Sequence, residues 1–374
     1  MSERISIRNV ADKGDLKTFI LFPYILNRNN SNWVPPLLLT QKLLFNKKHL
    51  FWKRNPHQFF LAFKDGKCVG RITAFVNQEH NAFHYLKEAC FGFLEAENDI
   101  QIFRELLITA ENFAKQNNCI EITGPINPSV HYELGVLTDG FEKPPYFMLT
   151  HNYNYYDEQI KCCGYNKLKD FYSYKLDGSQ YVPTEKMKRV AAFLKQRYKI
   201  SIRGADIKSF NKELDILYSI YNDAFIGHWG FTPMQKDEFS LLAKDLKSII
   251  DPRLILIAEM NTGPIAFLLC IPNFNEVFIK IKDGKLFPTG IFKLLSGKKK
   301  IRSARVITVA VKKKYQYLGV GALLYQEIMK RGLQFNYPEC ELSWVVEDNI
   351  MMNQVAKDLS ATPYKTYRLY SKKL

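Results

Sequence analysis

The chain contains the run Arg305-Val-Ile-Thr-Val-Ala-Val311-Lys-Lys-Lys-Tyr-Gln316-Tyr-Leu-Gly319-Val-Gly321-Ala322. Its β-branched beginning is typical of a strand, and the residues after Gly321 have the apolar spacing of a helix. Between them, Gln316-x-x-Gly319-x-Gly321 gathers free backbone amides and the positive end of a helix, with no glycine side chain to block a close approach. The junction is therefore predicted to bind a pyrophosphate. A plain turn before a helix is the alternative, and the third glycine of a dinucleotide-binding fold is missing.

This region resembles the GNAT superfamily of acyl-CoA N-acyltransferases. The superfamily signature is Gln or Arg, two residues, Gly, one residue, then Gly or Ala, and Gln316, Gly319 and Gly321 fill those positions. The similarity extends through residues 341–347, which resemble the fifth strand, to Asn353-Gln-Val-Ala-Lys-Asp-Leu359, which matches the superfamily's Asn-x-x-Ala-x-x-Leu helix. The resemblance implies an acetyl-CoA or other acyl-CoA donor. Its pantetheine arm would pair with the fourth strand, and its pyrophosphate would lie on the glycine turn. The implied cofactor-binding residues are Val309, Val311, Gln316, Gly319, Gly321, Ala322 and Asn353.

The catalytic acid departs from the superfamily pattern. Many members carry a Tyr directly after the Leu of the helix motif, where it protonates the leaving thiolate, but this chain has Ser360 there. Tyr364, Tyr367 or Tyr370 on the last strand is a possible substitute, although such spacing is also typical of packing. For the base, the candidates are Glu347 at the end of a strand and His228 in a glycine-flanked loop, each weighed against a structural role.

Two segments of the chain repeat the same order of elements. Hairpin patterns at 58–75 and 254–271 each lead through a further strand into a long helical pattern, at about 99–116 and 320–334. We therefore predict an α/β fold of two GNAT-like domains, each a mixed twisted sheet flanked by helices. The expected domains are 1–178, degenerate and with an N-terminal arm, and 179–374, with the acyl-CoA site. Because the first repeat lacks the glycine turn, we expect it not to bind CoA.

The amino-acid composition indicates which partners and cofactors to expect. The 374 residues carry 53 Lys and Arg against 37 Asp and Glu, a net charge of +16 that favours an anionic partner such as nucleic acid, a membrane surface or a phosphorylated cofactor. No apolar run is long enough to span a bilayer, and the first residues do not resemble a secretion signal, so we expect a cytoplasmic protein without a membrane partner. The seven cysteines have no metal-ligand spacing, and His80, His84 and His131 provide no complete ligand set, so no metal is expected.

The leading hypothesis is an N-acyltransferase that uses acetyl-CoA and modifies a small or peptidyl amine. One rival is a Fem-type peptidyltransferase, also a tandem GNAT fold, for which the positive charge would suit an aminoacyl-tRNA. A long coiled-coil arm would distinguish it. The other rival is a binding module that has kept the CoA site and lost the acid, for which Ser360 is the main evidence.

Overall fold

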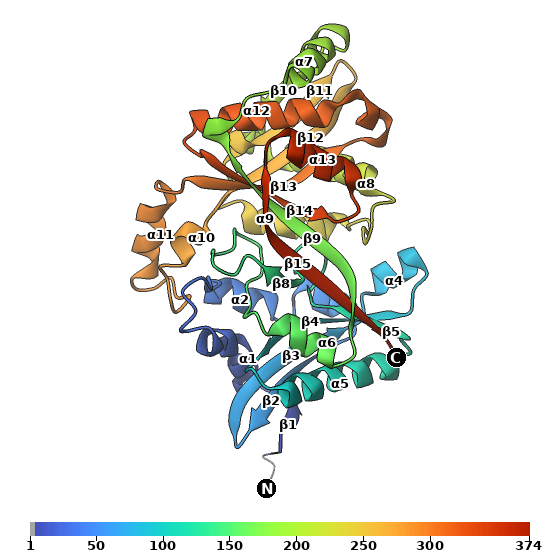
Figure 1. Ribbon diagram of the computed structural model, residues 1–374, viewed down its shortest axis with the longest axis vertical. Helices are drawn as coiled ribbons and strands as arrows, with labels where there is room; N and C mark the ends of the chain where they lie inside the picture. The colour runs from blue at the N-terminus through green and yellow to red at the C-terminus, as the bar shows by residue number, and fades with distance from the viewer. Residues whose placement is uncertain (1–3) are drawn as a thin grey trace. The chain divides into compact units, whose positions relative to one another are not determined.

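A computed structural model describes residues 4–374, which form two compact units (Figure 1). Unit 1 comprises the described residues up to Asp170 together with Asn275–Lys299 and Lys365–Leu374. Unit 2 comprises Phe171–Phe274 and Lys300–Tyr364. The chain passes from one unit to the other four times: inside the strands β9 and β15, and at the two ends of the segment Asn275–Lys299. The contiguous domains 1–178 and 179–374 stay a prediction about the two sequence repeats.

Unit 1 contains a mixed sheet in the order β1-β2-β3-β4-β5-β15, in which neighbours are antiparallel except for the parallel pair β4–β5. A short strand, β8, also pairs with β15, and β6 pairs with β7. Its strands are β1 (Ser6–Asn9), β2 (His57–Lys64), β3 (Lys67–Phe75), β4 (Glu88–Ala96), β5 (Glu121–Gly124), β6 (Ile126–Asn127), β7 (Glu133–Leu134), β8 (Val136–Asp139) and most of β15 (Thr362–Lys373). Its helices are α1 (Lys13–Leu26), α2 (Leu38–Leu44), α3 (Leu50–Arg54), α4 (Gln78–His84), α5 (Ile100–Gln116), α6 (Tyr156–Cys162), α10 (Asn275–Phe278) and α11 (Gly290–Lys298).

Unit 2 repeats this plan. Its sheet has the order β9-β14-β13-β12-β11-β10, and β13–β14 is its parallel pair. The strands are β9 (Asn166–Asp177), β10 (Ser201–Gly204), β11 (Ile255–Met260), β12 (Gly263–Pro272), β13 (Ser303–Val311) and β14 (Glu339–Val346). The helices are α7 (Glu185–Arg197), α8 (Phe210–Phe225), α9 (Lys236–Leu246), α12 (Val320–Gln334) and α13 (Ile350–Asp358), with four short 3-10 helices at Gly178–Gln180, Ile207–Ser209, Pro252–Leu254 and Lys313–Leu318.

The predicted hairpins and long helices are present, because local patterns specify them. Asp65 and Gly66 both have positive φ, as a tight hairpin turn between β2 and β3 requires. In each unit the long helix buries its apolar face on one face of the sheet: α5 through residues such as Leu106, and α12 through residues such as Leu324. The predicted α/β architecture, with a mixed sheet flanked by helices in each of two units, is confirmed.

Each unit is completed by the last strand of the other sequence repeat. In unit 2, β14 pairs with the end of β9, which closes the first repeat. In unit 1, β5 pairs with the end of β15, which closes the second repeat. The two repeats have therefore exchanged their final strands.

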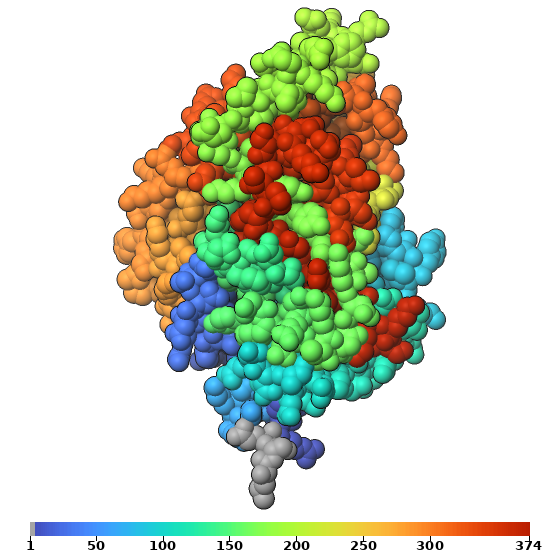
Figure 2. All heavy atoms as spheres, in the orientation of Figure 1, coloured from blue at the N-terminus to red at the C-terminus, as the bar shows by residue number. Residues whose placement is uncertain are grey.

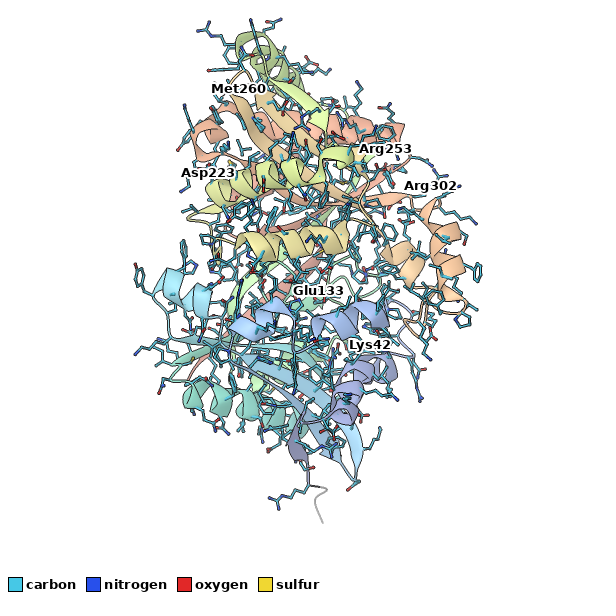
Figure 3. All side chains as sticks on the ribbon, turned by 180° about the vertical axis from the view of Figure 1, so that it is seen from behind. Lys42, Glu133, Asp223, Arg253, Met260 and Arg302 are labelled. Atoms are coloured by element: carbon cyan, nitrogen blue, oxygen red, sulfur yellow. The ribbon has the colours of Figure 1, made fainter. Side chains whose placement is uncertain are left out.

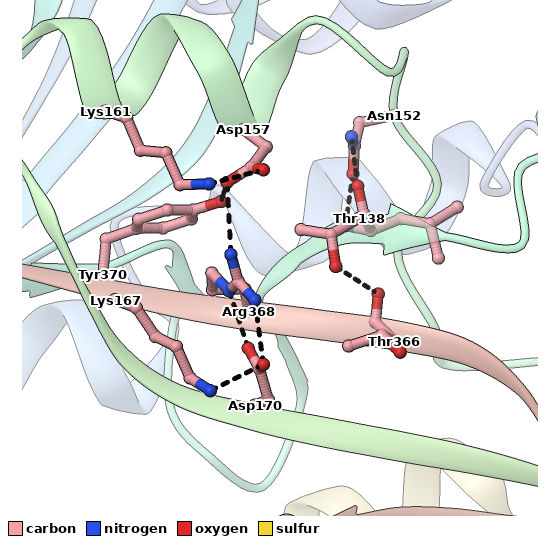
Figure 4. Close-up of polar contacts among 10 residues, drawn as sticks. Thr138, Asn152, Asp157, Lys161, Lys167, Asp170, Thr366, Arg368 and Tyr370 are labelled. Carbon is pink, nitrogen blue, oxygen red and sulfur yellow. Dashed lines mark hydrogen bonds and ion pairs between the residues drawn. The ribbon is translucent and has the colours of Figure 1, made fainter.

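Polar contacts fix the exchanged part of β15 within unit 1 (Figure 4). The Arg368 guanidinium donates to both carboxylate oxygens of Asp170, at 2.7 and 2.9 Å, and the Tyr370 hydroxyl donates to Asp157 at 2.6 Å. Burial alone would raise the pKa of Asp170, but hydrogen bonds from Arg368 and Lys167 outweigh it and hold that pKa below its ordinary value. Tyr370 therefore has a structural partner, and of the three tyrosines considered as acids only Tyr364 belongs to unit 2.

Candidate functional site

Strands β13 and β14 diverge in the middle of unit 2. Their parallel register covers four residues of each strand, from Ser303 opposite Glu339 to Val306 opposite Leu342. Beyond that point β13 continues to pair with β12 and β14 continues to pair with β9. The facing edges of β13 and β14 therefore have no ladder partner in the described chain, and their backbone groups can pair with an extended ligand.

A β-bulge lies at the start of this divergence. Thr308 pairs with Leu269 and Val306 pairs with Cys270, so Ile307 is an extra residue in β13. Bulges bend a strand and increase its twist. The predicted contact residues Val309 and Val311 follow the bulge, on the part of β13 that has separated from β14.

The glycine turn lies where β13 leads into α12. Gly319 has a φ of 84°, a left-handed conformation that favours glycine, and it stands at the N-cap of α12 without a side-chain cap from the described residues. A Cβ on Gly321 would meet no atom of the described chain within 4 Å, so open space adjoins the first turn of the helix. Open space beside Gly321, at the end of a helix whose first amides lack intrahelical partners, is what an anion site at a helix N-terminus requires.

Two contacts with α8 hold this turn. The Gln316 side-chain amide donates to the carbonyls of Ala224 and Val311, each at 3.1 Å, and the Lys313 amide donates to the Asp223 carboxylate at 2.8 Å. Figure 3 shows Asp223 on α8. The side chain of Gln316 therefore positions the turn through protein contacts.

Asn353 lies between the end of β14 and the start of α13, with its amide engaged by the protein. Its side-chain nitrogen donates to the carbonyls of Val346, Glu347 and Asn349, and its oxygen accepts from the Tyr174 hydroxyl at 2.7 Å. The predicted role in cofactor binding is not tested by these contacts, which show a residue that anchors α13.

The two candidate bases occupy different parts of unit 2. Glu347 follows β14 directly, and its carbonyl accepts from Asn353. His228 is exposed in the loop between α8 and α9, next to the positive-φ residue Gly227, and one of its ring nitrogens lies 3.2 Å from the Phe225 carbonyl. Because Gln316 binds the last turn of α8, the loop that carries His228 begins beside the glycine turn.

A buried charged cluster lies where β13 and β14 separate. Arg305 and Glu341 pair in the last part of the parallel register, and both residues are buried. The Arg305 guanidinium donates to the Ser343 hydroxyl at 2.8 Å, and Ser343 donates to Glu341. The other carboxylate oxygen of Glu341 accepts from the hydroxyl of Tyr364, which is half-buried. Sequence reasoning missed this cluster, although charged residues at two positions within apolar strands are a signal for it.

Unit 1 has the same parallel pair, but its own chain fills the divergence. Strands β4 and β5 pair from Glu88 to Cys90, and the backbone of Ile126 then approaches β4 so closely that a Cβ on Gly92 would lie 1.9 Å from its carbonyl oxygen. The Asn127 side chain accepts from the Phe93 amide at 2.6 Å. Protein therefore occupies the place where unit 2 has open strand edges.

The long helix of unit 1 is also capped by its own chain. The Asp99 carboxylate accepts from the Gln101 amide at 2.9 Å, at the first turn of α5. A carboxylate there satisfies a free amide and repels a second anion. The expectation that the first repeat does not bind CoA stays a prediction, with these two features in its support.

No protein-family model matches the chain. A bacterial ceramide synthase from Caulobacter vibrioides is 34% identical over 378 residues, which cover 99% of this chain and 98% of that protein. Protein YghO from Escherichia coli is 33% identical over 382 residues, which cover 98% of this chain and 95% of that protein. The chain belongs to the family of these two proteins.

Solved structures confirm the tandem GNAT fold. A tandem GNAT protein from the clavulanic acid biosynthesis pathway has a TM-score of 0.57 at 10% identity, covering 99% of this chain and 98% of that one. A GCN5-related N-acetyltransferase from Sphaerobacter thermophilus has a TM-score of 0.56 at 11% identity, covering 100% and 96%. These neighbours show that the chain has this fold along nearly its whole length. None of the helices within residues 4–374 has the length and apolar character needed to cross a bilayer.

Proposed function

We propose that this protein is an acyl-CoA-dependent N-acyltransferase that joins a long-chain acyl group to the amine of a sphingoid base. The observation that carries the proposal is the 34% identity, along nearly the whole of both chains, to a protein named a ceramide synthase. A ceramide is the amide of a fatty acid and a sphingoid base, so its synthesis is an N-acyl transfer. The open strand edges and the uncovered glycine turn of unit 2 supply the site that such a donor needs.

In this proposal the backbone holds most of the donor. The amides of residues 319–322 would bind the pyrophosphate, and Lys312, Lys313 and Lys314 would add positive charge beside it. The free edge of β13 at Val309 and Val311 would pair with the amides of the pantetheine arm. The donor supplies a thioester, whose carbonyl carbon is the electrophile.

The remaining chemistry needs a base and an acid. The attacking amine forms a C–N bond and loses a proton, while the C–S bond breaks and the thiolate takes up a proton. Glu347 and His228 are the proposed bases. We assign the acid to Tyr364, the one of the three candidate tyrosines that belongs to unit 2. Its hydroxyl proton, which it donates to Glu341 in this structure, would turn to the thiolate when the C–S bond breaks. This tyrosine would replace the one missing at Ser360.

Two alternatives from the sequence differ in observable ways. An acetyl donor with a small or peptidyl amine is the expectation from the superfamily resemblance, and the structure leaves the acyl group open. For a Fem-type enzyme, the helices within residues 4–374 are at most 17 residues long, as in α5, so this part of the chain contains no long coiled-coil arm. A CoA-binding module without catalytic turnover would bind CoA and form no amide.

A substrate matrix tests the proposal. The full-length protein is incubated with acetyl-, octanoyl- or palmitoyl-CoA and with sphinganine, a polyamine or a dipeptide, and the amide and the released CoA are measured by mass spectrometry. We expect N-palmitoyl-sphinganine with equimolar free CoA. An acetylated small amine as the main product would contradict the lipid assignment, and CoA binding without any amide would favour the binding module.

A further inference from the structure

An exposed apolar surface lies in unit 1, on the insertion between β12 and β13. Helix α11 runs from Gly290 to Lys298, and Phe292 and Leu295 on this helix are 71% and 63% exposed. Phe287, just before the helix, is 74% exposed. In Figure 2 the insertion is part of the orange surface, with the dark blue segment of α1 and α2 beside it.

The exposed side of α11 carries large apolar side chains, unlike that of an ordinary surface helix. A surface helix buries its large apolar side chains and exposes its polar ones. In α11 the buried positions are Gly290 and Gly297, and a Cβ on Gly297 would lie 2.8 Å from the Val277 side chain. Gly297 allows close packing on α10. Of the large apolar residues of α11, Ile291 and Leu294 are half-buried, and Phe292 and Leu295 are left exposed.

The insertion is in contact with the N-terminal segment. The Leu38 amide donates to the Gly284 carbonyl at 2.9 Å, and a Cβ on Gly284 would lie 2.6 Å from the Pro36 carbonyl oxygen. On the N-terminal side of this contact, Ile25, Leu39 and Leu43 are each between 57% and 58% exposed. We call the six exposed side chains the apolar face: Ile25, Leu39, Leu43, Phe287, Phe292 and Leu295.

Lysines are frequent in the two segments that carry most of the apolar face. The segment 275–299 has six lysines against two acidic residues, and the segment 37–50 has three lysines and no acidic residue. Lys42, which Figure 3 labels on α2, and Lys293 on α11 are both exposed. Exposed apolar side chains together with exposed lysines are the features of a protein surface that binds an anionic bilayer.

We propose that the apolar face docks on the surface of an anionic phospholipid membrane, with its apolar side chains at the acyl boundary and its lysines at the head groups. This replaces our expectation of no membrane partner. The inference does not rest on the proposed function, because binding to a lipid surface needs no turnover. If both hold, docking brings the site to the membrane in which long-chain amines and acyl chains partition.

Vesicle co-sedimentation of the full-length protein tests the proposal. We expect binding to vesicles that contain phosphatidylglycerol and at least tenfold weaker binding to pure phosphatidylcholine vesicles. The double variant Phe292→Ser/Leu295→Ser should reduce binding to the anionic vesicles at least tenfold, since each buried apolar side chain contributes strongly. The control is Ile120→Ser, which changes a 65% exposed side chain of the same unit outside the apolar face and should bind as the wild type does.

Three results would overturn the proposal. The first is a wild-type protein that binds neither kind of vesicle, and the second is a double variant that binds as well as Ile120→Ser does. The third is a lipid-free dimer, seen by light scattering, that the double variant converts to a monomer, because a second copy would then cover the apolar face. Thermal melting of both variants confirms that each is folded.

Discussion

Tyr364 is the residue on which the proposed proton transfer to the leaving group depends. Removing its hydroxyl removes the acid, but a thiolate leaves without full protonation, so the loss is moderate. We expect Tyr364→Phe to lower kcat by roughly 10- to 100-fold without changing the affinity for CoA. Tyr85→Phe, at a 95% exposed tyrosine of unit 1, is the matched control. Steady-state rates of the two variants decide the matter, and equal rates would leave Tyr364 with a structural role only.

Glu341 is the residue that balances the buried Arg305. Their side chains are 0% and 2% exposed, and breaking a buried pair leaves one charge without compensation. Glu341→Gln should therefore lower the free energy of unfolding by about 3 to 5 kcal/mol. Glu339→Gln, two residues away on the same strand, loses a partly exposed ion pair with Lys175 and should change it by less than about 1 kcal/mol. Chemical denaturation measures both, and similar small effects would show that the cluster contributes little to stability.

The two proposed bases are separable by kinetics. An ammonium group does not attack a thioester until it is deprotonated, so the base should matter more than the acid. We expect one of the variants Glu347→Gln and His228→Ala to lower kcat at least roughly 100-fold and to alter the pH–rate profile of the reaction. Profiles that match the wild type in both variants would rule out these two assignments.

The parallel pair of strands β4 and β5 places two carboxylates opposite each other. Glu88 lies opposite Glu121, and burial followed by repulsion from Glu121 raises the pKa of Glu88 to about 7. Both the native and the unfolded protein hold this proton at low pH. As the pH rises from about 4.5 to about 7 the unfolded state releases it first, so the native state loses stability across that window.

Glu88→Gln removes this pH dependence. Its free energy of unfolding should exceed that of the wild type by about 1 to 3 kcal/mol above pH 7, and the gain should vanish below pH 4.5. Glu97→Gln, which changes an exposed partner of Lys67, is the control and should show no such trend. Denaturation curves across the pH range test this, and a gain that does not depend on pH would contradict the assigned pKa.

Local elements were predictable from the sequence, and their long-range partners were not. The Asp65-Gly66 hairpin and the turn at Gly319 depend on neighbouring residues, so their patterns are visible in one sequence. The exchange of β9 and β15 was not visible, because both strands end similar repeats and suit either edge. The same holds for the Arg305–Glu341 pair, which a parallel ladder brings together from distant positions. The exposure of large apolar side chains on α11 accompanies the packing of Gly297 on Val277, a contact that periodicity does not reveal.

At the scale of the molecule, one fold is used in two ways. Unit 2 leaves the strand edges and the helix N-terminus open, whereas unit 1 fills the same places with Asn127 and Asp99. Duplicated sheets and helices therefore do not imply two ligand sites. We therefore expect one donor site for each chain, at the glycine turn before α12.

A calorimetric titration of the full-length protein with CoA counts the donor sites directly. We expect one site per chain in the wild type, no binding in Gly321→Glu, and near wild-type binding in Gly321→Ala. The glutamate would place an anion in the cradle, whereas a Cβ at this position meets no neighbouring atom. Two sites per chain, no site in the wild type, or a site that survives Gly321→Glu in a folded protein would contradict this expectation.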